Sequence, residues 1–186
     1  MAFSGGSHKR LRVVIESYLT EAKLAAALKQ LVGTAWIGGQ ATLPGSRRRF
    51  DMAFQDNGEI VLVEYDGDEH YRDSLKIKAD ARKDALAISH GMRLVRVPYW
   101  VQLTNETARH YFGLEAEIEQ SFPHGFITTK LFPASFCEMG IERFRREFEA
   151  LPVNIREAVM ASLRARAEEH GVEYVLPSVL RGLIDA

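Results

Sequence analysis

The sequence lacks the features that mark secreted and membrane proteins. It contains one cysteine in 186 residues, which excludes an internal disulfide, and an isolated thiol does not predict a zinc site. No apolar run approaches the roughly 18 residues that a membrane-spanning helix needs. The first residues, MAFSGGSHKR, lack the apolar segment and cleavage site of a secretory signal. We therefore expect a cytoplasmic globular protein with no membrane partner, in which Cys137 is a buried small hydrophobe.

The formal net charge is only −1, but the charges are distributed unevenly along the chain. Residues 1–50 carry eight lysines and arginines against two acids, whereas residues 51–70 carry seven acids and no lysine or arginine. Residues 71–104 are basic again, with seven lysines and arginines against three acids. Carboxylates flanked by basic residues suit a site that binds phosphate through a divalent cation. An acidic turn between two solvated faces would give the same pattern.

Hydrophobic periodicity predicts an α/β chain. Apolar residues follow helical spacing from Leu11 to Leu19 and again from Leu24 to Leu31, with an N-cap near Thr20 and an end at Gly33. Alternating runs then predict strands over residues 47–54 and 59–66, separated by a hairpin turn at residues 56–58. A helix over residues 72–90 and a strand over residues 92–99 complete the first half of the chain.

Helical patterns take over in the C-terminal part of the chain, notably over residues 141–151 and 152–170. We expect residues 1–104 to form a core in which helices flank a mixed central sheet. We expect residues 105–186 to form a helical extension that packs on this core or belongs to the same domain.

Three carboxylates are candidates for one site. Because side chains alternate along a strand, Glu64 and Asp66 point the same way, and Asp51 lies on the partner strand of the hairpin. Like charges this close repel each other unless a cation neutralises them, and hard oxygen ligands suit magnesium or manganese. His70 follows at the strand exit, where it could move a proton, although an isolated histidine in a turn is more often a surface residue.

The order FDMAF, EYDGDEH, a basic helix and LVRVP resembles the PD-(D/E)XK nuclease superfamily, and more closely its branch related to the very short patch repair endonuclease. The resemblance extends from about Thr20 to Leu103 and implies a restriction endonuclease-like core. The residues that match the functional positions of that branch are Glu21, Gln40, Asp51, Glu64, Asp66 and His70.

One position departs from the superfamily pattern. The superfamily usually has a lysine two residues after the second acid, and Asp66 stands there instead. The role of that lysine passes either to His70 or to a basic residue on the following helix. Lys76 and Lys83 share one face of that helix with Asp80, so either lysine could reach back to the site, although a solvated helix face gives the same spacing.

The resemblance implies roles for these residues in phosphodiester hydrolysis. Asp51, Glu64 and Asp66 would bind Mg²⁺ or Mn²⁺, Glu21 would complete the site, and His70 would move the proton. Glu21 is equally well explained as an acid that stabilises the first turn of its helix. The candidate nucleic-acid contacts are Gln40, Arg47, Arg49, Lys76 and Lys83, with Arg47 and Arg49 on the same strand face as Asp51.

We therefore expect a Mg²⁺-dependent endodeoxyribonuclease that uses no organic cofactor. It would nick DNA or, as a homodimer or with a partner subunit, make double-strand breaks. Two alternatives remain. One is a nucleic-acid-binding or interaction module that keeps the fold without catalysis. The other is an RNA nuclease with the same site, since nothing in the sequence discriminates a 2′-hydroxyl.

Overall fold

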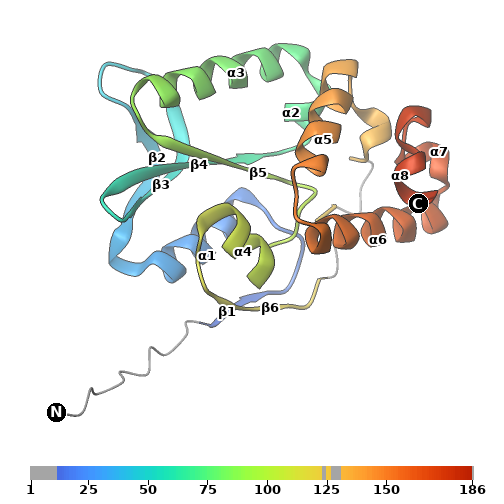
Figure 1. Ribbon diagram of the computed structural model, residues 1–186, viewed down its shortest axis with the longest axis horizontal. Helices are drawn as coiled ribbons and strands as arrows, with labels where there is room; N and C mark the ends of the chain where they lie inside the picture. Colours follow the sequence, from blue (N-terminus) through green and yellow to red (C-terminus); the bar gives the residue numbers. More distant parts are fainter. Residues whose placement is uncertain (1–11, 123–124, 127–130, 186) are drawn as a thin grey trace.

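The computed structural model describes residues 12–122, 125–126 and 131–185. Its centre is a four-stranded mixed sheet flanked by helices (Figure 1), as expected from the sequence. The strand order is β2-β3-β4-β5, in which β2 pairs with β3 and β3 with β4 in antiparallel fashion, while β4 and β5 are parallel. The four strands are β2 (Trp36–Thr42), β3 (Arg49–Asp56), β4 (Glu59–Asp66) and β5 (Arg93–Pro98).

A tight turn fixes the register of β3 against β4. Asn57 and Gly58 both have positive φ, 47° and 88°, which is the backbone conformation that favours these two residue types in two-residue hairpin turns. The pairing runs from Asp56 opposite Glu59 to Met52 opposite Val63. The predicted hairpin is therefore confirmed, and its register sets which acidic side chains meet beyond the last pair.

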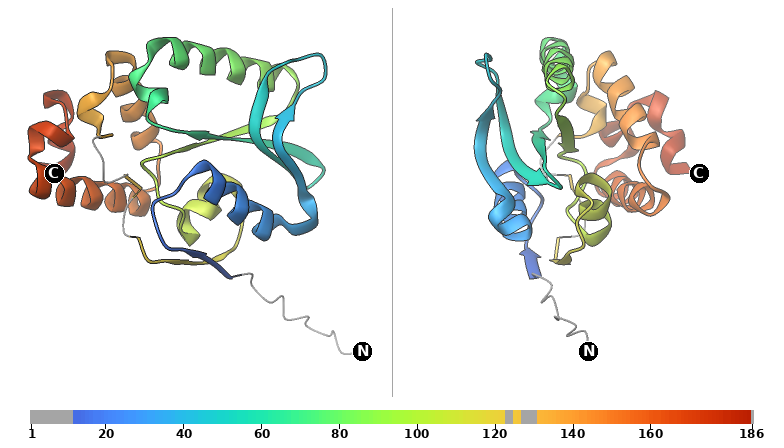
Figure 2. Two further views of the ribbon diagram at one scale, coloured as in Figure 1. Left: turned by 180° about the vertical axis from the view of Figure 1, so that it is seen from behind. Right: turned by 60° about the vertical axis from the view of Figure 1, so that its left-hand side comes forward.

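Helices cover both faces of this sheet (Figure 2). On one face, α1 (Glu21–Val32) packs Leu24 and Leu28 against sheet residues such as Met52. The predicted boundaries of α1 are confirmed, since the Thr20 side chain accepts a hydrogen bond from the Lys23 amide and the helix ends at Gly33. On the other face lies α3 (Ser74–Ser89), which follows the short α2 (Glu69–Arg72) and supplies the crossover that the parallel pair β4 and β5 requires.

The N-terminal helix predicted over residues 11–19 is wrong. Residues Arg12–Ile15 form strand β1, which pairs in parallel with β6 (Glu117–Gln120) in a separate two-stranded sheet. Val13 and Ile15 are buried whereas Arg12 and Val14 are exposed, which is the two-residue period of a strand. An apolar run this short fits either period, and its partner lies about a hundred residues later, where no local signal indicates the pairing.

The C-terminal part of the chain contributes to two cores. Residues of α4 (Asn105–Phe112) and β6 pack in the same hydrophobic cluster as α1 and the central sheet, so this cluster extends past residue 104. A second, aromatic-rich cluster joins Tyr99 and Trp100 to Phe144 and Phe148 of α5 (Glu138–Glu149). It also includes α6 (Val153–His170), which confirms the predicted C-terminal helices.

The remaining elements are short. Cys137, expected to be buried, is half-buried immediately before α5. Within the described residues, no helix is both long and apolar enough to cross a membrane. The short helices are α7 (Val172–Val175), α8 (Gly182–Asp185) and the 3₁₀ segments Gly33–Ala35, Pro133–Ser135 and Ser178–Leu180.

Helix α5 lies unusually close to α2. A Cβ atom built at Gly140 of α5 would stand 1.7 Å from the carbonyl oxygen of Tyr71 in α2, so only glycine fits at this contact. The amide of Cys137 also donates a hydrogen bond to the same carbonyl, at 3.1 Å. The C-terminal helices are therefore held against the segment that follows β4.

Candidate functional site

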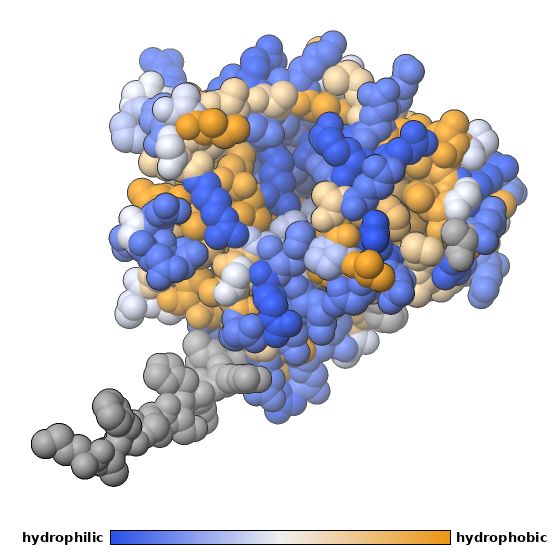
Figure 3. All heavy atoms as spheres, viewed as in Figure 1, coloured by the Kyte–Doolittle hydropathy of each residue, from blue (hydrophilic) through white to orange (hydrophobic). Residues whose placement is uncertain are grey.

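A polar cavity of about 570 Å³ opens where β3, β4, α1, α2 and α3 meet. The face of the molecule seen in Figure 3 is hollowed beneath α3, and hydrophilic residues dominate this hollow. Acids and bases line the cavity together, as the charge pattern of the sequence indicates. Its ionisable lining includes Glu21, Arg48, Arg49, Asp51, Glu64, His70, Lys76, Asp80 and Lys83.

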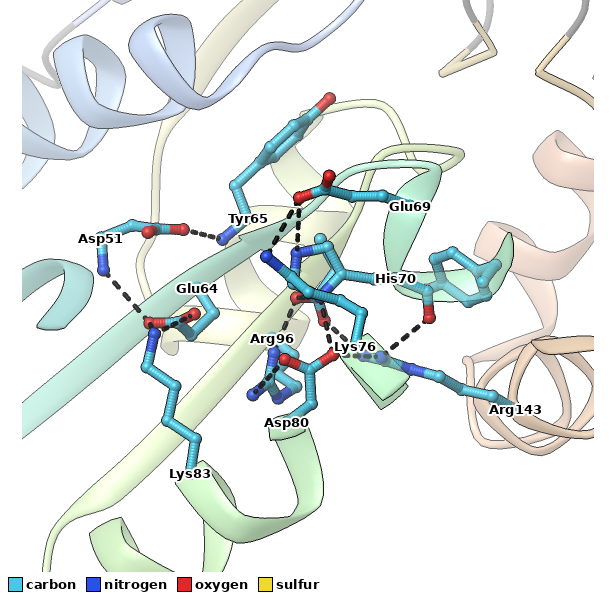
Figure 4. A network of polar contacts seen from close by, with 12 residues as sticks. Asp51, Glu64, Tyr65, Glu69, His70, Lys76, Asp80, Lys83, Arg96 and Arg143 are labelled. Atoms are coloured by element: carbon cyan, nitrogen blue, oxygen red, sulfur yellow. Dashed lines mark hydrogen bonds and ion pairs between the residues drawn. The ribbon is translucent and has the colours of Figure 1, made fainter. Parts of the chain in front are cut away.

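Asp51 and Glu64 meet just beyond the last hydrogen-bonded pair of the β3–β4 hairpin. The Asp51 amide donates to Glu64 Oε1 at 3.2 Å, and the Tyr65 amide donates to Asp51 Oδ2 at 2.8 Å (Figure 4). Each carboxylate therefore accepts a hydrogen bond from the neighbouring strand where the backbone ladder ends. This exchange fixes the two side chains relative to each other.

Lys83 of α3 brings a positive charge to this pair. Its Nζ lies 2.6 Å from Glu64 Oε1 and 2.7 Å from Glu64 Oε2. The Glu64 side chain is only 4% exposed and that of Lys83 16%, so water screens this ion pair little. Of the two lysines considered from the sequence, Lys83 reaches the acids directly. Lys76 also lines the cavity but pairs with Glu69 at 3.0 Å.

Burial and mutual repulsion perturb the carboxylates. Burial raises the pKa of Glu64, and Asp51 raises it further, while the hydrogen bond from Lys83 opposes the shift. The pKa of Glu21 is also raised, by burial and by the nearby charge of Asp51. Glu21, Asp51 and Glu64 thus crowd negative charge in one cavity, and oxygen donors of this kind fit a small hard cation such as Mg²⁺ or Mn²⁺.

Asp66 does not lie with these acids. It is fully buried, receives a hydrogen bond from Arg96 Nη1 at 2.6 Å and another from Arg143 Nη2, and does not line the cavity. Both of its oxygens are thus occupied by guanidinium groups. This arrangement opposes the expected role of Asp66 as a metal ligand, because a cation would have to displace an arginine.

His70 joins Asp66 and Asp80 in a buried cluster. Its Nδ1 lies 2.7 Å from Asp80 Oδ2 and 3.1 Å from Asp66 Oδ1. Burial alone would raise the pKa of Asp80, but the hydrogen bond from His70, the charge of Arg96 and the hydrogen bond from Arg143 lower it to about 2.

The three residues Asp66, His70 and Asp80 are close enough to hold a metal ion. Arg96 and Arg143 already neutralise the two carboxylates, however, and a divalent cation there would face two guanidinium charges. Asp51 and Glu64 both line the open cavity and face a single ammonium, that of Lys83, so they are the better candidates for a cation.

Some of the predicted nucleic-acid contacts line the cavity and others lie outside it. Arg49 lines the cavity as expected, but Arg48 lines it in place of Arg47, which is exposed outside it. The alternation used to place Arg47 applies only within a strand, and β3 begins at Arg49. Gln40 is exposed on β2 with a φ of 53° and does not line the cavity.

Two arginines that bind Asp66 belong to no sequence motif. Arg96 projects from β5 to Asp66 and Asp84, and the alternation along that strand indicates that only one of Arg93 and Arg96 can join the site. Arg143 comes from α5, 77 residues after Asp66, and no spacing rule connects positions so far apart.

Comparison with known proteins does not identify a relative of this chain. No protein-family model, no curated protein and no solved structure matches it. The functional interpretation therefore depends on the geometry of the cavity and on the motif resemblance.

Proposed function

We propose that this chain is a metal-dependent endonuclease with a restriction endonuclease-like core, which hydrolyses DNA phosphodiester bonds. The observation that carries the proposal is the contact of Lys83 with Glu64 beside Asp51 and Glu21. Two acids on neighbouring strands and a lysine beside them are the elements of a PD-(D/E)XK site. Here the lysine comes from the following helix, and so restores the group that is missing at position 66.

Asp51 and Glu64 would hold the cation, and Glu21, which lines the same cavity, would orient water beside it. When bound, Mg²⁺ or Mn²⁺ supplies a Lewis acid that polarises a phosphoryl oxygen and lowers the pKa of water. Lys83 forms a short ion pair with Glu64 that water screens little. Its ammonium would balance the negative charge that builds on the scissile phosphate.

His70 would move the proton. Its Nδ1 is engaged by Asp80 and Asp66, so Nε2 is the nitrogen left for proton exchange with water or with the leaving oxygen. His70 lines the same cavity as Asp51 and Glu64.

Arg48, Arg49 and Lys76 would bind the phosphates that flank the scissile bond. All three line the cavity. The side chains of Arg48 and Arg49 make no ion pair with any acid in the described ranges, so both guanidiniums are available. Contacts of this kind position a duplex without reading its sequence, and the proposal therefore includes no target sequence.

The test is cleavage of supercoiled plasmid by purified protein with Mg²⁺ or Mn²⁺, with EDTA as the blank. Asp51→Asn and Lys83→Met should each abolish or strongly reduce cleavage, because one removes a cation ligand and the other the charge beside it. The matched controls are Asp56→Asn on the same strand and Lys78→Met on the same helix, which lie outside the cavity and should cleave normally.

Open-circular product would indicate nicking of one strand, and linear product would indicate cleavage of both strands. Absence of cleavage together with salt-sensitive DNA binding would favour a module without catalysis. Faster cleavage of RNA than of DNA would favour an RNA nuclease. Normal cleavage by Asp51→Asn would refute the assignment of the site.

A further inference from the structure

Arg143 donates hydrogen bonds to four residues beside the cavity. It lies on α5, its side chain is 5% exposed, and all three of its guanidinium nitrogens donate hydrogen bonds. Nε donates to Glu147 at 2.7 Å, and Nη1 donates to Asp80 Oδ2 at 2.8 Å and to the His70 carbonyl at 3.1 Å. Nη2 donates to Asp66. One side chain thus holds both carboxylates that contact Nδ1 of His70, and the backbone carbonyl of His70 itself.

The same carboxylates determine the protonation of the His70 ring. Nδ1 faces Asp80 Oδ2 at 2.7 Å and Asp66 Oδ1 at 3.1 Å. Ionised carboxylates only accept hydrogen bonds, so Nδ1 must carry a proton. In the neutral imidazole, Nε2 is then the acceptor. Nε2 lies 4.0 Å from Oε1 of Glu69, whose side chain is 66% exposed. Figure 4 shows this side of the ring turned toward Glu69 and Lys76.

Arg143 is itself held firmly. Glu147 accepts hydrogen bonds from both Arg143 Nε and the Tyr71 hydroxyl, the latter at 2.5 Å. The guanidinium also stands 5.0 Å from the centre of the Tyr71 ring. Since Tyr71 directly follows His70 and touches Gly140 of α5, the helix that carries Arg143 is locked to the segment that carries His70.

We propose that Arg143 is a positioning residue for His70. By holding Asp66 and Asp80 in place, it fixes the imidazole with Nδ1 protonated and with Nε2 presented to the cavity for proton transfer. The proposal rests on the proposed nuclease function. It also assigns a role to the C-terminal helices, which the motif resemblance does not cover.

The test compares Arg143→Lys with Arg146→Lys, the same change on the same helix at an exposed position. Lysine keeps the charge, but its single nitrogen cannot span both carboxylates and the carbonyl. Long-range ¹H–¹⁵N NMR spectra of histidine-labelled protein report the tautomer directly, and His70→Gln identifies the His70 signals. Circular dichroism checks that each variant is folded.

At a pH where the imidazole is neutral, His70 should carry its proton on Nδ1 in the wild type and in Arg146→Lys, and Arg143→Lys should show a mixture of tautomers. Arg143→Lys should also cleave DNA about 10- to 100-fold more slowly, with an unchanged KM. A neutral wild-type His70 with its proton on Nε2 would overturn the proposal without any variant, and so would an unchanged tautomer in folded Arg143→Lys. If the tautomers behave as expected but the wild type cuts no nucleic acid, the nuclease function fails instead.

Discussion

Replacement of Lys83 by methionine would isolate the contribution of its charge to the folded site. Methionine keeps an unbranched apolar stem of similar length, which can remain near the Phe50 ring that Lys83 Nζ approaches at 4.8 Å. Glu64, whose side chain is 4% exposed in the wild type, loses this ammonium partner. Removing one partner of a buried ion pair typically costs about 3–5 kcal/mol. Since Glu64 can relax toward the cavity or bind a proton, we expect a loss of about 2–4 kcal/mol near neutral pH without metal.

The loss should depend on pH. Burial raises the pKa of Glu64 above its ordinary value of 4.5, although the hydrogen bond from Lys83 opposes this shift. Removal of Lys83 raises the pKa further, so Glu64 binds its proton at a higher pH in the variant. The protonated acid needs no cation. The variant is therefore most destabilised above the folded pKa of Glu64, and it recovers as the pH falls through that value.

Urea unfolding in EDTA, followed by tryptophan fluorescence at a series of pH values, measures this difference. Lys78→Met, on the same helix but exposed and outside the cavity, should stay within about 0.5 kcal/mol of the wild type. Equal stability of Lys83→Met and the wild type at every pH would refute the ion pair. A difference that grows as the pH falls would refute the reasoning about Glu64.

Two further changes test the packing and the phosphate contacts. Gly140→Ala should destabilise the protein by about 2 kcal/mol or more, because its Cβ meets the α2 backbone at 1.7 Å. Thermal unfolding measures this loss of stability, and Gly182→Ala, where the Cβ meets open space, is the control. Arg48→Ala should weaken DNA binding and reduce the slope of log K against log salt by about 1, whereas Arg47→Ala, outside the cavity, should change both less. Anisotropy titrations at several salt concentrations compare these two variants, and equal effects would contradict the assignment of Arg48.

Local signals predicted the part of the site that comes from the hairpin. The Asn57-Gly58 turn sets the register of β3 against β4, and that register brings Asp51 to Glu64. Thr20 and Gly33 set the ends of α1 and so the position of Glu21. In each case the residues that determine the geometry lie within a few positions of the residues they place.

Longer-range features could not be predicted from the sequence. The short apolar segment that forms β1 fits a helical period as well as the two-residue period of a strand. Its partner β6 decides between them, and β6 lies far along the chain. Alternation placed Asp66 on the same strand face as Glu64, but Arg96 and Arg143 engage both of its oxygens. Only the packing of α5 on α2 brings Arg143 to that position, and no local pattern encodes this contact.

The most direct test of the account is to locate the bound cation. A crystal structure of the protein with Mn²⁺, with the anomalous signal recorded, would show which carboxylates hold it. The account predicts a peak between Asp51 and Glu64, and a guanidinium pair still bound to Asp66. A peak within the cluster of Asp66, His70 and Asp80, or none at Asp51 in a crystal saturated with Mn²⁺, would contradict it.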